Sequence, residues 1–130
     1  MRLLEIHIES EDVKKSIMFY KEILEYEKIL ELNDKRQIMF VMKDGCCFGI
    51  WEKGFRGIHD GRGARHLHFA FQIPPSQYRM YKVRLEALGI KVSEHEWNDG
   101  ERSMYFFDPD GNQGEFMTKD WLGGKIGTLQ

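Results

Sequence analysis

Apolar and polar residues alternate over residues 3–9, near the start of the chain. On one side of an extended chain this alternation places Glu5 and His7, and on the other it places aliphatic residues. A repeat of two residues predicts a β-strand with one apolar face. The other face of this strand then carries two side chains with acid, base or metal-ligand chemistry.

A helix and three strands are expected next. Ser10 and Asp12 are candidate N-caps, because a side-chain oxygen just before a helix accepts a hydrogen bond from a free N–H of the first turn. Apolar residues then recur at helical spacing, which predicts a helix over residues 12–25. Extended segments follow at residues 27–32, 36–43 and 46–52, with Asp44-Gly45 as a hairpin turn before the last of them.

The second half of the chain repeats this order of elements. Residues 53–65 are rich in glycine and basic residues and lack periodicity, which is typical of a loop or linker. A strand is then predicted in the segment RHLHFAFQI, followed by a helix over residues 76–88. Three more strands are expected within residues 90–97, 102–107 and 113–118, the last two joined by a turn at Asp108-Pro109-Asp110-Gly111.

Both halves therefore follow the order β-α-β-β-β, at a repeat of about 60 residues. A four-stranded sheet with one helix keeps one face uncovered, so two such units must pair. We expect an α+β fold of two βαβββ repeats, forming a pair of mixed-sheet half-barrels that a homodimer completes. As a single domain over 1–130, the chain would comprise repeat one at about 3–52, a linker at 53–65, repeat two at about 66–118 and a tail at 119–130.

Net charge and cysteine content limit the partners and the cellular compartment that we expect for the protein. The net charge is −2, so no bulk basic field attracts nucleic acid or an anionic membrane. Cys46 and Cys47 are adjacent and cannot easily form an ordinary disulfide, which indicates a reducing compartment. The first ten residues turn charged too early for a signal-peptide core, and no apolar run is long enough to span a membrane. We expect a cytoplasmic protein without nucleic-acid or membrane partners.

Five side chains on predicted strands are candidates for metal binding. They are Glu5, His7, His66, His68 and Glu115. A carboxylate among apolar neighbours is costly unless it is paired or binds a cation. Imidazole and carboxylate ligands suit Zn, Ni, Fe or Mn, and three protein ligands leave coordination positions open for substrate.

The spacing of these residues alone leaves other interpretations open. A single histidine on a strand is more often hydrogen-bonded than metal-bound, and His59 and His95 are expected to be solvated. The H-x-H pair of the cupin fold is followed within a few residues by a carboxylate, where this chain has Phe71-Gln72. The basic residues of the linker are as consistent with a wet surface as with an anion site.

Two segments carry a resemblance to a known family. The first repeat opens with DVKKSIMFYKEIL, and the second closes with GERSMYFFDPDGNQGEF. These segments resemble the vicinal oxygen chelate superfamily, which includes glyoxalase I, fosfomycin-resistance enzymes, extradiol dioxygenases and bleomycin-resistance binding proteins. The resemblance runs over roughly residues 3–118 and implies a homodimer with a site shared between its chains.

The resemblance implies a set of metal ligands. His68 stands directly before the Phe69-Ala70-Phe71 triplet, and Glu115 follows the DPDG turn, both at family ligand positions. The first-strand ligand position, counted back from the Phe19-Tyr20 pair, falls on Glu5, where the family usually has histidine. The implied cofactor is a divalent metal ion, Zn, Ni, Mn or Fe, held by Glu5, His68 and Glu115.

The resemblance also assigns residues around the metal. His7 and Glu115 are the candidate catalytic residues, with His7 as the general acid or base, because an imidazole exchanges protons near neutral pH. His66, Tyr105 and Trp51 are expected to line the substrate pocket. Gly49 takes the place of the fourth ligand of glyoxalase I, and the arginine that fosfomycin enzymes carry after the last ligand has no counterpart.

Two functions are consistent with these residues. The first is a metal-dependent enzyme in which the ion acts as a Lewis acid on a small molecule that chelates it through oxygen atoms. The reaction would be lyase-like or isomerase-like, or a dioxygenation if the metal is iron. The alternative is a non-catalytic protein that binds a drug or metabolite, as the bleomycin-resistance members do. A third interpretation is a protein of the same scaffold in which Glu5 has abolished metal binding, so that His68 and Glu115 pair with each other.

Overall fold

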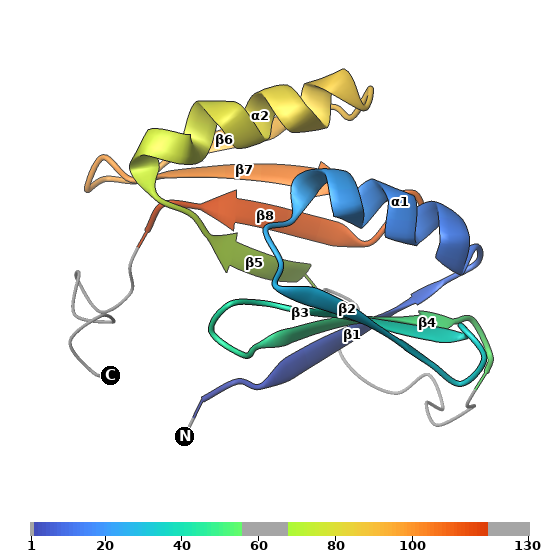
Figure 1. Ribbon diagram of the computed structural model, residues 1–130. Helices are drawn as coiled ribbons and strands as arrows, with labels where there is room; N and C mark the ends of the chain where they lie inside the picture. Colours follow the sequence, from blue (N-terminus) through green and yellow to red (C-terminus); the bar gives the residue numbers. More distant parts are fainter. Residues whose placement is uncertain (1, 56–67, 120–130) are drawn as a thin grey trace. The chain divides into compact units, whose positions relative to one another are not determined.

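The computed structural model describes residues 2–55 and 68–119 of the chain. The chain divides into two compact units, Met1–Arg65 and His66–Gln130 (Figure 1). Each unit contains one four-stranded sheet and one α-helix, in the order that the sequence predicts. The expected α+β fold of two βαβββ repeats is confirmed; that the repeats form a single domain stays a prediction.

The first unit is built on the sheet β1-β4-β3-β2. Its strands are β1 (Glu5–Ser10), β2 (Lys28–Leu32), β3 (Gln37–Val41) and β4 (Cys47–Glu52). β1 runs parallel to β4, and the other neighbouring pairs are antiparallel, so the sheet is mixed. Helix α1 (Val13–Ile23) packs against β3 and β4. Its N-cap is Asp12, whose carboxylate accepts a hydrogen bond from the backbone N–H of Lys15.

The second unit repeats this topology as the sheet β5-β8-β7-β6. Its strands are β5 (His68–Gln72), β6 (Ser93–Glu96), β7 (Arg102–Phe107) and β8 (Gln113–Met117). β5 is parallel to β8, and the other pairs are antiparallel. A 3-10 turn (Pro75–Gln77) leads into helix α2 (Tyr78–Ala87), which packs against β8. The helix ends before Gly89, whose φ of 75° is easily reached only without a side chain.

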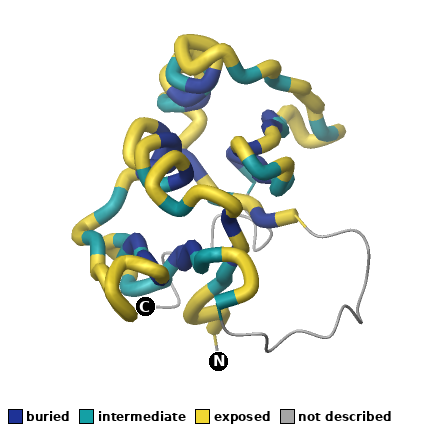
Figure 2. The backbone as a smooth tube through the Cα atoms, turned by 90° about the vertical axis from the view of Figure 1, so that its right-hand side faces the viewer, coloured by how far each residue is buried: buried dark blue, intermediate teal, exposed yellow. Residues whose placement is uncertain are grey.

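Each sheet has its own apolar core on the face that its helix covers. The most buried residues of the first unit include Tyr20, Ile38, Phe40, Phe48 and Ile50. Those of the second unit include Leu85, Met104, Phe106 and Phe116. Figure 2 shows buried segments on the helices and on the strands, with exposed turns between them.

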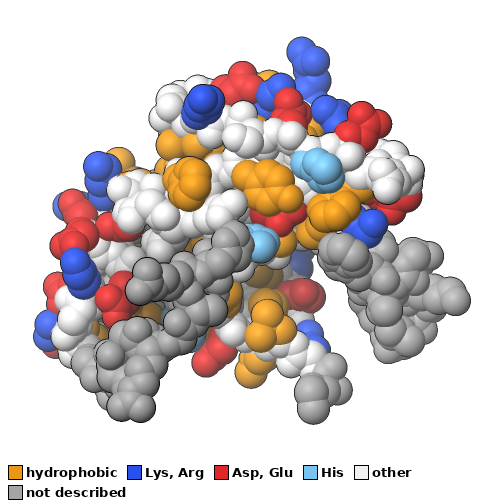
Figure 3. Space-filling view, turned by 180° about the vertical axis from the view of Figure 1, so that it is seen from behind, with side chains coloured by type: hydrophobic (Ala, Val, Ile, Leu, Met, Phe, Trp, Pro, Cys, Tyr) orange, Lys and Arg blue, Asp and Glu red, His pale blue; other side chains and the backbone are white. Residues whose placement is uncertain are grey.

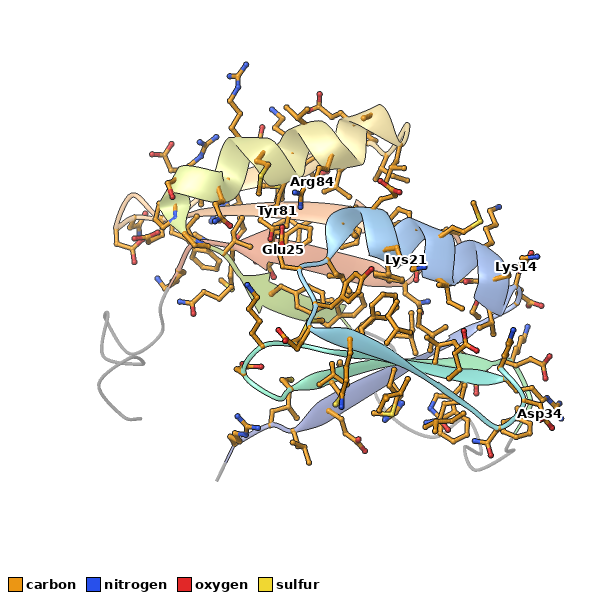
Figure 4. The ribbon with its side chains drawn as sticks, in the orientation of Figure 1. Lys14, Lys21, Glu25, Asp34, Tyr81 and Arg84 are labelled. Atoms are coloured by element: carbon orange, nitrogen blue, oxygen red, sulfur yellow. The ribbon has the colours of Figure 1, made fainter. Side chains whose placement is uncertain are left out.

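The helices present opposite faces to the sheets and to solvent. On α2, the ring of Tyr81 points to the sheet and lies 4.6 Å from the Phe116 ring, between centroids (Figure 4). On α1, Lys14 and Lys21 are exposed (Figure 4). Each helix therefore covers one face of its sheet, and those predicted site residues that the structure describes lie on the other face. No helix in the described parts of the chain is long and apolar enough to span a membrane.

Candidate metal centre

His68 and Glu115 meet on the face of the second sheet that α2 leaves uncovered. The parallel register pairs Ala70 with Glu115, which makes His68 a diagonal neighbour of Glu115 on the same face. The Nε2 atom of His68 lies 3.4 Å from Oε2 of Glu115. The sequence placed both residues at ligand positions, and the structure brings them together.

One carboxylate oxygen of Glu115 has no hydrogen-bond partner among the described residues. Glu115 is buried, and its Oε1 atom is unpartnered within the described part of the chain. An unsatisfied buried oxygen of this kind costs about 1–3 kcal/mol, and more when it is charged. A cation would satisfy it, and the neighbouring imidazole nitrogen is a second suitable donor. The residues present therefore fit a divalent metal ion.

Tyr105 stands directly across the strand pair from Glu115. Burial, and next the nearby carboxylate of Glu115, raise the pKa of the Tyr105 phenol. The phenol therefore stays protonated at neutral pH and can donate a hydrogen bond. That Tyr105 contacts a substrate stays a prediction.

A hollow of about 410 Å³ extends from Tyr105. It is lined by Lys91, Ser93, Tyr105, Phe107 and Gln113. The ammonium group of Lys91 makes no ion pair with the described residues. Two of its lining residues, Gln113 and Tyr105, are the register partners of His68 and Glu115, although neither His68 nor Glu115 lines the hollow itself. Sequence reasoning missed Lys91, because a lysine in the coil two residues before β6 carries no distinctive pattern.

The turn between β7 and β8 is fixed by Asp108. Its buried carboxylate accepts hydrogen bonds from the backbone N–H groups of Asp110 and Asn112 and from the Asn112 side chain. These bonds hold the hairpin that sets Tyr105 opposite Glu115. The DPDG motif therefore contributes to the site by fixing the strand register.

Glu5, His7 and Trp51 form a second cluster, in the first unit. The Nε2 atom of His7 lies 3.4 Å from Oε1 of Glu5. The indole N–H of Trp51 donates a hydrogen bond of 2.7 Å to Nδ1 of His7. The sequence named all three residues as candidates but did not predict that Trp51 binds His7, because that contact depends on the register of β1 and β4.

Gly49 occupies the place in the first repeat that Glu115 has in the second. β4 pairs Gly49 with His7, as β8 pairs Glu115 with Ala70. The two registers make Gly49 and Glu115 equivalent positions of the two repeats, and the lack of a fourth ligand stays a prediction. The His7 ring fills the space beside Gly49.

The predicted ligands belong to different units of the chain. Glu5 lies in the first unit, and His68 and Glu115 lie in the second. Among the described residues, no group of three or more His, Cys, Asp and Glu side chains could hold a metal ion. His66, a predicted pocket residue, lies outside the described residues. Figure 3 shows histidine side chains at the surface beside hydrophobic ones.

The family model of the Glyoxalase/Bleomycin resistance protein/Dioxygenase superfamily matches residues 2–116. The chain belongs to this superfamily. This confirms the vicinal oxygen chelate resemblance on which the ligand assignment rests. The described site residues, from Glu5 to Glu115, all lie inside the matched range.

A curated relative has a named activity. It is the metallothiol transferase FosB of Staphylococcus saprophyticus, which is 31% identical over 121 residues. The match covers 92% of this chain and 72% of the relative. Superfamily members thus include a metal-dependent transferase.

Solved structures of similar fold come from two further kinds of protein. The fosfomycin resistance protein FosX of Listeria monocytogenes, in a monoclinic form at pH 6.5, is 27% identical, with a TM-score of 0.71 and 92% of both chains covered. A mutant of FosX was solved with Mn(II) and 1S,2S-dihydroxypropylphosphonic acid; it is 22% identical, with a TM-score of 0.73, covering 98% of this chain and 97% of that one. Lactoylglutathione lyase of Agrobacterium tumefaciens is 22% identical, with a TM-score of 0.71, covering 89% of this chain and 92% of that one.

Proposed function

We propose that the protein is a divalent-metal-dependent enzyme acting on a small molecule that binds the metal through oxygen atoms. Glu5, His68 and Glu115 would hold the ion. The observation that carries this proposal is the buried, unpartnered Oε1 atom of Glu115 beside the His68 imidazole. A non-catalytic structural carboxylate at this depth would be expected to have its hydrogen bonds satisfied.

A bound ion, Mn(II), Zn(II), Ni(II) or Fe(II), would supply Lewis acidity toward a substrate oxygen. The protein's own residues then have three tasks. Tyr105 donates a hydrogen bond from a phenol that burial keeps protonated. Lys91 offers a positive charge to an anionic substituent in the hollow. His7 is our candidate for moving a proton to or from the substrate.

We infer a small anionic substrate from the hollow beside the metal ligands. Its volume of about 410 Å³ is suited to a compact molecule, and among the described residues its cationic lining residue is Lys91. The relatives support this choice, since FosX was solved with a phosphonic acid and FosB is a thiol transferase. Addition of a thiol or of water to an activated carbon is therefore the reaction we favour, ahead of lyase, isomerase or dioxygenase chemistry.

We further propose a cytoplasmic homodimer with a shared site. The two free cysteines, Cys46 and Cys47, support a reducing compartment. The separation of Glu5 from His68 and Glu115 into different units supports a site assembled from two repeats. Sedimentation velocity with and without Mn(II) would test the assembly, and a strictly monomeric protein would contradict it.

The alternative function is binding without catalysis. It would use the same hollow to sequester a ligand, as the bleomycin-resistance members of the superfamily do. The unpartnered oxygen of Glu115 favours the enzyme, because a binding protein without metal has no use for that buried charge. A screen of small phosphonates and carboxylates by thermal shift, with and without Mn(II), separates the two functions. Stabilisation that needs the metal supports the enzyme, and stabilisation without metal supports the binding protein.

The direct test is metal binding by the purified protein. We expect about one divalent ion per chain by elemental analysis after purification without chelators, and loss of that ion in Glu115→Gln and His68→Gln. Glu94→Gln and His95→Gln are matched controls, because both residues lie on the same sheet and neither is a proposed ligand. A wild-type protein without stoichiometric metal, or a Glu115→Gln variant that retains it, would overturn the proposal.

A further inference from the structure

Trp51, His7 and Glu5 contact one another in that order on the face of the first sheet that α1 does not cover. Trp51 on β4 donates its indole N–H to Nδ1 of His7 on β1, at 2.7 Å. Nε2 of His7 faces the Glu5 carboxylate at 3.4 Å. Both nitrogens of the His7 ring are therefore directed at named partners.

The hydrogen bond from Trp51 sets the proton position on His7. An indole nitrogen is only a donor, so Nδ1 of His7 must be the acceptor. The neutral ring then carries its proton on Nε2, which faces Glu5. The result is an N–H group aimed at one oxygen of the Glu5 carboxylate, Oε1, which leaves the other oxygen available to a cation.

Gly49 makes room for this arrangement. It is the cross-strand partner of His7, and a Cβ atom placed on Gly49 would overlap the His7 ring. Any other residue at position 49 would displace the ring. The glycine thus leaves room for the imidazole to lie against β4, where the hydrogen bond from Trp51 orients it.

The Trp51 side chain, which donates the hydrogen bond to His7, has further contacts of its own. The ring of Phe55 lies 5.9 Å from that of Trp51, between centroids. The guanidinium of Arg36 lies 4.1 Å from the centre of the Phe55 ring. Its Nε atom donates a hydrogen bond of 2.6 Å to Oε2 of Glu52. These contacts help to hold Trp51 on the face of the first sheet that α1 does not cover.

Glu5 needs such support if it is to bind a metal. Its side chain is 51% exposed and has several rotatable bonds, whereas Glu115 is held by burial. A flexible ligand loses side-chain entropy on binding unless neighbours orient it in advance. Groups that orient a ligand in this way typically change metal affinity about 10–100-fold when removed.

We propose that His7, held by Trp51 and Gly49, is a positioning residue that orients the Glu5 carboxylate for metal binding. This inference rests on the proposed metal-dependent function and assigns the first-strand ligand its support. Orienting Glu5 before the metal binds is a different role for His7 from the transfer of protons to a substrate.

The test measures the Kd for Mn(II) by calorimetry in variants shown by circular dichroism to be folded. We expect His7→Phe and Trp51→Phe each to weaken Mn(II) binding about 10–100-fold. His7→Gln should weaken binding less than His7→Phe, because its amide keeps an N–H group for Glu5. A loss of equal size in His7→Gln and His7→Phe would contradict the positioning role.

The second unit supplies matched controls. His95 and Trp97 also form a ring pair, with centroids 4.8 Å apart, but the Trp97 N–H donates to Ser103. We expect His95→Phe and Trp97→Phe to leave the Kd within about threefold of the wild type. A similar loss in these variants would assign the effect to general destabilisation and would overturn the inference.

The metal-dependent function and the positioning role of His7 can be contradicted separately. If the wild type binds no Mn(II), the proposed function fails. If the wild type binds Mn(II) and His7→Phe and Trp51→Phe bind it equally well, only the positioning role fails. Hydrogen exchange of the Trp51 indole N–H in metal-free protein provides a readout without any metal. We expect it to accelerate in His7→Phe, and an unchanged rate would contradict the inferred hydrogen bond.

Discussion

Glu115 and His68 lie 3.4 Å apart across β5 and β8, yet solvent reaches them very differently. The side chain of Glu115 is 4% exposed and that of His68 is 37% exposed. A cation arriving from solvent would meet the imidazole first and the carboxylate at the base of the site. In the metal-free protein, Glu115 is the residue whose burial costs free energy, because its carboxylate is removed from water without a cation to compensate it.

Replacing Glu115 by methionine should stabilise the metal-free protein. The substitution removes a buried unpartnered oxygen and puts an apolar chain of similar size in its place. We expect a gain of about 1–3 kcal/mol in the free energy of unfolding, measured by urea denaturation in the presence of a chelator. Glu96→Met, at an exposed position of β6, should change it by no more than about 0.5 kcal/mol. A destabilised Glu115→Met protein would indicate that the carboxylate is compensated without metal.

Asp108→Ala should destabilise the second unit. It removes a buried carboxylate that accepts three hydrogen bonds in the turn between β7 and β8. We expect a loss of about 2–4 kcal/mol by thermal or urea unfolding. The comparison is Asp44→Ala in the corresponding turn of the first repeat, where the carboxylate accepts one bond, from Cys46 N–H, and the loss should be about 1 kcal/mol. Equal losses in the two variants would argue against the special role of Asp108.

Stability at acid pH should depend on Glu94. Hydrogen bonds from Lys82 and from Tyr78 lower the pKa of Glu94 below its ordinary value. A carboxyl group whose pKa is lower in the folded state stabilises the fold above the ordinary glutamate pKa of about 4.3 and loses that contribution as the pH falls through the folded-state value. Glu94→Gln should therefore be less stable than the wild type at pH 7 by up to about 1 kcal/mol, because the group is largely exposed. The difference should shrink toward pH 3, and urea denaturation at both pH values measures it. A difference independent of pH would exclude the charged form as its source.

Gly114→Ala should cost stability in the core of the second unit. A Cβ atom at this position would overlap the ring of Phe106, which is buried. We expect a loss of about 1–3 kcal/mol by urea denaturation, typical of overpacking. Gly49→Ala, which displaces the partly exposed His7 ring, should cost less stability. If the two losses were equal, the His7 ring would be as tightly confined as the Phe106 ring.

The elements of the fold were predictable because each has a clear period in the sequence. Alternation over residues 3–9 gave β1, and the acid at position 12 caps α1 as expected. His68 and Glu115 could be selected through the FAF and DPDG motifs, whose register the parallel pairing of β5 and β8 then explains.

The remaining features depend on contacts that no local pattern encodes. The bond between Trp51 and His7 joins two strands through the parallel pairing of β1 and β4. The lack of a partner for Oε1 of Glu115 among the described residues depends on how the neighbouring strands bury this side chain, which the local sequence does not show. Lys91 became a candidate only when the hollow was seen, because an exposed lysine is ordinary in sequence.

The pairing of His7 with Gly49 constrains how this chain could change. In the second repeat the large residue, Glu115, stands on β8 opposite the small Ala70, whereas in the first repeat the large residue stands on β1 and the small one on β4. A glutamate at position 49 would collide with the imidazole, and an alanine at position 7 alone would leave a gap. Acquiring a fourth ligand here therefore requires two coordinated substitutions, each unfavourable without the other. Such sign epistasis separates this protein from a four-ligand relative by more than the number of differing residues suggests.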